Sequence, residues 1–314
     1  AMRRTVLGKT GLKISSLGLG TWGLSGDAYG SVSDEDQERG IERARARGSS
    51  LFETADVYAH GEMERRLGRL LSTDTKAVVV TKVGTDRDAN PPRKCFKPDY
   101  LRSAIEKSLE RLKLPRVVVL LHNPSKKALE ADGTSEVLRK LTEEKAIAGW
   151  GVSAGDVDVG RAALDQGAQV LQLAFNAFMR RDFQELKGEI AAHEAALLAR
   201  SVLAHGLLCG HWSLHKDFPD GDHREERWTP DDLRRRINQL SALRSVIGGE
   251  VLTMRAAALR YVLATEGITA AILGPKSAVQ LDQLVREAGR EQPYLSEEKF
   301  NKLEARLADV GVTT

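Results

Sequence analysis

Short apolar runs rich in β-branched residues alternate along the chain with longer stretches in which apolar residues recur every three or four positions. The short runs are typical of buried strands, and the longer stretches are typical of amphipathic helices packed on a sheet. This alternation predicts βαβ units around a parallel sheet. The predicted strands are residues 15–20, 50–55, 77–83, 117–122, 146–153, 170–176, 196–202 and 269–274. The helices predicted between them include residues 33–46, 61–71, 98–112, 134–145 and 157–166.

Eight strands with intervening helices in 314 residues favour an α/β fold of the (β/α)8 or TIM-barrel type over an open sheet. No linker rich in Pro, Gly or Ser divides the chain, so we expect a single domain over residues 1–314. Residues 5–14 predict an N-terminal β-hairpin that turns at residues 9–11 and covers the barrel floor. Residues 296–310 predict an extra C-terminal helix capped by Ser296.

Composition and charge exclude several classes of partner. The chain has 47 basic and 44 acidic residues, and the basic residues are scattered along the predicted helices, so we expect neither a nucleic-acid nor a membrane partner. No apolar run approaches the ~20 residues of a membrane span, and the first residues do not resemble a signal peptide. Cys95 and Cys209 match no metal-binding or CxxC spacing, which indicates free thiols and a cytoplasmic protein. The pattern predicts no particular oligomeric state.

A glycine motif after the first predicted strand offers a rival interpretation. Gly18, Gly20 and Gly23 spell GxGxxG, the fingerprint of a Rossmann dinucleotide site. In that site the glycines lead directly into a helix whose N-terminus binds the pyrophosphate. Here helical periodicity begins only near Asp34, so we expect no Rossmann domain.

Four polar residues stand at or just beyond the ends of neighbouring predicted strands. Glu53 and Tyr58 follow the second strand, Lys82 ends the third and His122 ends the fourth. The C-terminal strand ends of a barrel converge on one face, where its catalytic groups lie. We expect the ammonium group to lower the pKa of the tyrosine from about 10, the imidazole to bind the same substrate oxygen, and the carboxylate to orient the lysine. This set predicts a site that delivers a proton to a carbonyl oxygen.

These residues lie in segments that resemble the aldo-keto reductase family. The resemblance runs from GKTGLKISSLGLGTW through TADVY, VTK, LLHNP and GVS to ILGPKSAVQLDQL. It implies a small carbonyl substrate, Tyr58 as general acid, Lys82 and His122 as its electrostatic partners, and NADPH as hydride donor. The cofactor-binding residues that it implies are Thr21, Trp22, Ser153, Gln172, Arg200, Ser201, Leu203, Gly206, Gly274, Lys276, Ser277, Gln280 and Gln283.

Within that set the resemblance implies separate tasks. Ser153 and Gln172 would hold the nicotinamide carboxamide, and Arg200 stands where many members stack an aromatic ring on the nicotinamide. Lys276 and Ser277 would face the 2′-phosphate of the adenosine ribose, which favours NADP over NAD.

The chain also departs from the family pattern. Glu53 replaces the usual Asp, and Ala154 and Leu284 each replace a common Asn. Because of Glu53, an NADP(H)-binding regulatory or sensing protein with little turnover is the alternative function. A third hypothesis is a barrel lyase that uses the Lys82 amine to form a Schiff base.

The long connection at residues 203–230 carries further candidates. It is rich in Gly, His and Asp and follows the seventh predicted strand, on the side where barrel enzymes bind ligands. Asp222, His223 and Arg224 are candidates for closing on cofactor or substrate. Trp22 and Trp212 either line a substrate pocket or cover apolar surface. The histidines of this connection are spaced too irregularly for a metal site.

Overall fold

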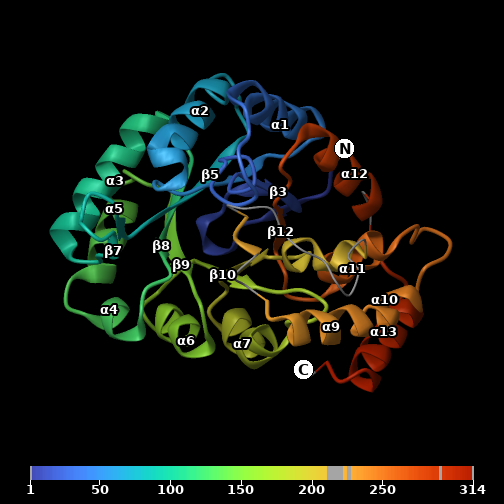
Figure 1. The fold of residues 1–314 in the computed structure, drawn as a ribbon. Coiled ribbons are helices and arrows are strands. Elements are labelled where there is room, and N and C mark those ends of the chain that lie inside the picture. Colours follow the sequence, from blue (N-terminus) through green and yellow to red (C-terminus); the bar gives the residue numbers. More distant parts are fainter. Residues whose placement is uncertain (1, 211–221, 225–227, 290–291, 313–314) are drawn as a thin grey trace.

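The computed structural model describes residues 2–210, 222–224, 228–289 and 292–312. Eight parallel strands close into a barrel, and helices surround them (Figure 1). This confirms the predicted (β/α)8 fold, and each predicted strand contains one observed strand. Around the barrel the order is β3 (Leu17–Gly20), β4 (Leu51–Glu53), β5 (Val78–Val83), β8 (Val117–His122), β9 (Gly149–Ser153), β10 (Val170–Ala174), β11 (Ala196–Arg200) and β12 (Ala270–Leu273).

The helices form the outer layer and bury their apolar faces against the strands. The five helices predicted by range are present, with ends displaced by at most two residues. Ser296 caps the last helix by accepting the backbone N–H of Lys299, as predicted. The helices are α1 (Asp34–Ala46), α2 (Glu62–Leu70), α3 (Pro98–Leu112), α4 (Lys126–Glu130), α5 (Thr134–Glu143), α6 (Val157–Asp165), α7 (Arg181–Ala192), α9 (Pro230–Gln239), α10 (Ser241–Arg244), α11 (Met254–Ala264), α12 (Ala278–Ala288) and α13 (Glu297–Asp309).

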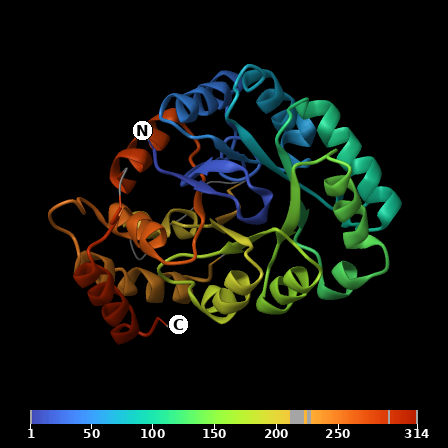
Figure 2. The same cartoon turned by 180° about the vertical axis from the view of Figure 1, so that it is seen from behind.

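The predicted N-terminal hairpin closes the barrel floor. Strands β1 (Arg4–Val6) and β2 (Lys13–Ser15) pair antiparallel, and Figure 2 shows them in front of the barrel when it is seen from behind. Leu7 and Ile14 are fully buried in a core cluster inside the barrel, together with the lower residues of the strands. Gly8 has a φ of +51°, and a Cβ there would lie 2.7 Å from the backbone nitrogen of Ala196. The hairpin therefore fits tightly into the barrel end.

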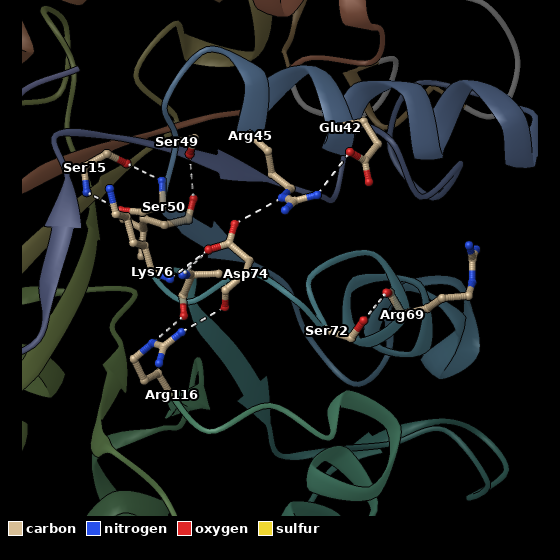
Figure 3. Close-up of polar contacts among 12 residues, drawn as sticks. Ser15, Glu42, Arg45, Ser49, Ser50, Arg69, Ser72, Asp74, Lys76 and Arg116 are labelled. Carbon is tan, nitrogen blue, oxygen red and sulfur yellow. Dashed lines mark hydrogen bonds and ion pairs between the residues drawn. The ribbon is translucent and has the colours of Figure 1, made fainter. Parts of the chain in front are cut away.

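Polar contacts hold the elements together near the floor (Figure 3). Ser15 and Ser50 each donate a backbone N–H to the other's hydroxyl, both at 2.9 Å. Asp74, which follows α2, accepts a hydrogen bond from Arg45 Nε of α1 at 3.1 Å. Arg116, just before β8, donates to the Asp74 carbonyl at 3.1 Å. These contacts join segments that precede the four neighbouring strands β3, β4, β5 and β8.

The glycine motif serves close packing rather than a Rossmann site, as expected. After β3 the next helix is α1, which begins only at Asp34. A Cβ on Gly18 would lie 2.8 Å from the Leu51 side chain, and one on Gly23 would lie 2.8 Å from the Pro275 carbonyl. Within the described ranges, no helix is both long and apolar enough to cross a bilayer.

Candidate functional site

A cavity of about 630 Å³ opens at the C-terminal ends of the barrel strands. All eight strands contribute to its lining, and most of the predicted site residues meet there. The predicted residues that line it are Trp22, Glu53, Tyr58, Lys82, His122, Ser153, Gln172, Arg200, Ser201, Leu203, Gly206, Gly274, Lys276 and Gln280. Thr21, Ser277 and Gln283 are not among the lining residues. Thr21 is fully buried, and its hydroxyl donates to Thr54 Oγ1 at 2.9 Å.

A buried carboxylate joins three strands at the base of the cavity. Glu53 Oε1 lies 2.7 Å from Lys82 Nζ, and Glu53 Oε2 accepts from Gln172 Nε2 at 2.9 Å. All three residues are at most 6% exposed. Burial lowers the pKa of Lys82, and the neighbouring carboxylate opposes that shift. The longer side chain of glutamate therefore keeps the expected pair with lysine and adds a contact with Gln172.

Tyr58 stands in the short 3-10 segment Tyr58–Gly61, directly above this pair. The Lys82 ammonium lies 5.1 Å from the centre of the phenol ring, and the His122 ring lies edge-on with its centre at 6.4 Å. The expectation of a lowered pKa for Tyr58 is wrong, because the net shift is upward. Burial raises that pKa well above its ordinary value and Glu53 raises it further, while Arg200 opposes them. The phenol is therefore protonated at neutral pH.

His122 is held as a neutral imidazole. Burial lowers its pKa well below the ordinary value, and the cations Lys82, Lys94 and Arg200 lower it further. Lys94 belongs to the small hairpin of β6 (Thr85–Asp86) and β7 (Arg93–Lys94), and its ammonium donates to the His122 carbonyl at 2.8 Å. His122 Nδ1 is buried with no hydrogen-bond partner among the described atoms. The sequence pattern did not single out Lys94, because its hairpin strands are only two residues long.

Ser153, Arg200 and Gln172, which were expected at the nicotinamide, each form a hydrogen bond within the protein. Ser153 Oγ donates to Asn123 Oδ1 at 3.1 Å, and Asn123, which directly follows His122, also lines the cavity. Arg200 Nη2 donates to the Ala154 carbonyl at 2.9 Å. Gln172 Oε1 is buried and has no partner among the described atoms. The sequence analysis missed Asn123 although it lies in the LLHNP segment that carried the resemblance.

A second part of the cavity is formed at the N-terminus of α12. Ser277 caps this helix by accepting from the Gln280 backbone N–H at 3.2 Å, and Gln280 Oε1 accepts from the Lys276 backbone N–H at 2.9 Å. Arg255 of α11, which was not predicted, lines the same end and forms a two-pronged ion pair with Glu287. A helix N-terminus beside cationic side chains attracts anions such as phosphate.

Aromatic rings pack together beside the cavity. His223 packs against Trp22 with ring centres 4.5 Å apart and against Tyr29 at 5.2 Å. Arg224 pairs with Asp222 at 2.6 Å and lines the cavity. This arrangement agrees with a role of residues 222–224 beside the ligand, which stays a prediction.

The other candidate residues of the connection at residues 203–230 lie outside the described part of the chain. Trp212 lies outside the described residues, as do His211 and His215. Among the residues that the structure describes, no group of three or more His, Cys, Asp or Glu side chains is placed to hold a metal ion.

Comparisons with known proteins show which family this chain belongs to. The model of the aldo/keto reductase family matches residues 16–307. A curated relative, aldo-keto reductase YhdN of Bacillus subtilis, is 25% identical over 301 residues, which cover 92% of this chain and 89% of the relative.

Solved structures show the same fold. The glycerol dehydrogenase AKR11B4 of Gluconobacter oxydans has a TM-score of 0.82 at 24% identity, covering 100% of this chain and 96% of that one. The holo form of aldo-keto reductase AKR11C1 of Bacillus halodurans has a TM-score of 0.80 at 22% identity, covering 98% and 96%. With a family match over nearly its full length, this chain belongs to the aldo/keto reductase family and is an oxidoreductase that uses a nicotinamide cofactor.

Proposed function

We propose that this protein reduces an aldehyde or ketone to the alcohol with NADPH, and that Tyr58 supplies the proton. The observation that carries the proposal is the meeting of Tyr58, Lys82, His122 and Glu53 at one cavity, with a protonated phenol beside a neutral imidazole. A neutral phenol can donate a proton to a carbonyl oxygen, and a neutral imidazole can donate a hydrogen bond to the same oxygen.

The cavity fits a nicotinamide cofactor. Gln172 Oε1 is a buried acceptor without a partner among the described atoms, and a carboxamide N–H is a suitable donor for it. Ser153 and Asn123 stand on the neighbouring side of the cavity and offer further polar contacts. Lys276 and the capped N-terminus of α12 would hold the 2′-phosphate, which is the reason for choosing NADPH.

The residues at the base divide the work of proton transfer. The bound cofactor supplies hydride to the carbonyl carbon. Tyr58 donates its proton as negative charge develops on the carbonyl oxygen, and the Lys82 ammonium stabilises the resulting phenolate. Glu53 keeps Lys82 charged and oriented through their contact at 2.7 Å. His122 orients the substrate oxygen by a hydrogen bond.

A direct assay tests the proposed function. Purified protein mixed with NADPH should lose tryptophan fluorescence, because Trp22 lines the cavity. Addition of aldehydes and ketones of varied size should then consume NADPH and yield alcohols in equal amounts. Binding of NADPH without consumption by any carbonyl compound would contradict the proposal.

The alternative of a sensing protein rests on Glu53. The intact Glu53–Lys82 contact supports the reductase instead, because the longer carboxylate still reaches the ammonium. If Glu53 is what makes the protein a sensor with little turnover, Glu53→Asp should raise the reductase rate strongly. If the active site requires glutamate, the same substitution should lower that rate. The Schiff-base hypothesis predicts that borohydride traps a carbonyl compound on Lys82 without any nicotinamide.

Domain organisation and location belong to the same proposal. One core cluster extends from Met2 to Val312, which supports a single domain over residues 1–314. A cytoplasmic location is part of the same proposal.

A further inference from the structure

The contact between Glu53 and Gln172 crosses the barrel. In the closed strand order, four steps separate β4, which carries Glu53, from β10, which carries Gln172, in either direction. The two strands therefore face each other, and the Glu53 and Gln172 side chains meet across the interior at 2.9 Å while Glu53 also holds Lys82 on the neighbouring strand. An aspartate, shorter by one methylene group, can keep Lys82 but leaves Gln172 out of reach.

This contact sets the orientation of the amide of Gln172, a residue that lines the cavity. An ionised carboxylate only accepts hydrogen bonds, so the amide nitrogen must point toward Glu53. The amide oxygen is thereby directed away from Glu53, where it is buried without a partner among the described atoms. A buried acceptor without a partner favours any ligand that brings an N–H donor to it.

We propose that Glu53 is a positioning residue that fixes the orientation of the Gln172 amide, and thereby makes the site select a nicotinamide ring whose 3-substituent carries an N–H donor. This inference rests on the proposed function, because it concerns the cofactor of that reaction. The same carboxylate holds the ion pair beneath Tyr58, so one side chain serves both cofactor selection and proton transfer.

The test compares two reduced cofactors by their binding alone. One is NADPH, and the other is its 3-acetylpyridine analogue, in which a methyl ketone replaces the carboxamide and no N–H remains. Tryptophan fluorescence gives the Kd of each. In the wild type we expect NADPH to bind about 10-fold more tightly, which is the factor expected for satisfying one buried acceptor.

Glu53→Gln is the decisive variant because it keeps the length and volume of the side chain. Lys82 must receive the oxygen of the new amide, so the nitrogen of that amide faces Gln172 and turns the Gln172 amide around. Gln172 then presents an N–H to the cavity, which both cofactors can accept, and the preference should fall to within about twofold. Glu53→Asp should weaken the preference as well, because it releases Gln172. Glu64→Gln is the matched control.

Glu64, like Glu53, is a buried glutamate that accepts hydrogen bonds from other side chains. Its donors are Thr81, Ser108 and Arg111, and Gln172 is not among them. Its variant should keep the preference of about 10-fold. Thermal melting establishes that each variant is folded. The preference of the wild type for NADPH over the analogue is measured on the wild type alone, so it does not depend on any variant folding. Equal binding of both cofactors by the wild type, or an unchanged preference in folded Glu53→Gln, overturns the inference but leaves the proposed function intact. Failure of the wild type to bind either cofactor overturns both.

Discussion

Burial, more than the neighbouring ammonium group, decides the protonation state of Tyr58. The sequence places a lysine near the tyrosine, and the charge of that lysine alone predicts a lowered pKa. The structure also withdraws the phenol from solvent and places Glu53 close to it, and both raise the pKa. A sequence shows which charges can meet, but it does not show how deeply they are buried.

The meeting of the candidate residues at one cavity was predictable where strand ends carry them. Glu53, Lys82, His122, Ser153 and Gln172 all lie within strands whose apolar runs are clear in the sequence. The bond between Glu53 and Gln172 was not predictable, because the two residues are 119 positions apart and meet only when the barrel closes.

Asp56 gives the clearest expected pH effect on stability. Burial raises its pKa from 3.8 to about 7, nearby Glu64 adds to the shift, and Arg111 and Lys94 oppose it. Because the folded protein then binds more protons than the unfolded chain between these values, this group makes stability fall as pH rises through that window. Asp56→Asn removes the titration.

Thermal melting across pH checks this expectation. The variant should gain stability relative to the wild type as pH rises from about 4 to about 8, and the difference should then level off. A difference that does not change with pH would show that the Asp56 carboxyl titrates normally.

At the scale of elements, helices with one apolar and one polar face were predictable from the sequence. A helix that is buried on nearly all sides was not. Helix α3 was predicted with its observed bounds, because its buried positions recur at helical spacing. Helix α11 is buried on nearly every side and so shows no polar stripe. The strands β6 and β7 are too short to leave a pattern. These two exceptions contribute Arg255 and Lys94, which the sequence analysis missed.

The N-terminus of α12 is expected to set the choice between NADPH and NADH. Lys276→Ala should weaken NADPH about 10-fold by removing a charged donor to the 2′-phosphate, and should change NADH by less than about twofold. Fluorescence titration with both cofactors measures this. Arg286→Ala, in the last turn of the same helix, is the control and should change neither. Equal weakening of NADH would argue against a 2′-phosphate at Lys276.

At the scale of the whole molecule, the residues that stabilise the barrel floor and the residues that line the polar cavity lie at different ends of the barrel. The floor hairpin and its core cluster close one end, and the polar site occupies the other. This division was predictable from the general rule that barrel enzymes place their chemistry at the C-terminal strand ends. The shape of the cavity was not, because loops far apart in the sequence form it.

A pair of adjacent substitutions tests this separation. Leu7→Ala removes a fully buried side chain from the barrel interior and should cost about 2–5 kcal/mol of unfolding free energy. Val6→Ala, at a neighbouring position that is 49% exposed, should cost less than about 0.5 kcal/mol. Urea denaturation measures both. The KM for NADPH of folded Leu7→Ala should stay within about twofold of the wild type, and a larger change would contradict the separation.

The most direct measurement of the central claim is turnover and cofactor binding in Tyr58→Phe. This variant keeps the ring beside Lys82 and His122 but lacks the proton that the carbonyl oxygen receives. We predict that kcat for carbonyl reduction falls about 10²- to 10⁴-fold while the Kd for NADPH stays within about twofold. A variant that reduces the same substrate at a rate within tenfold of the wild type would show that Tyr58 is not the proton donor.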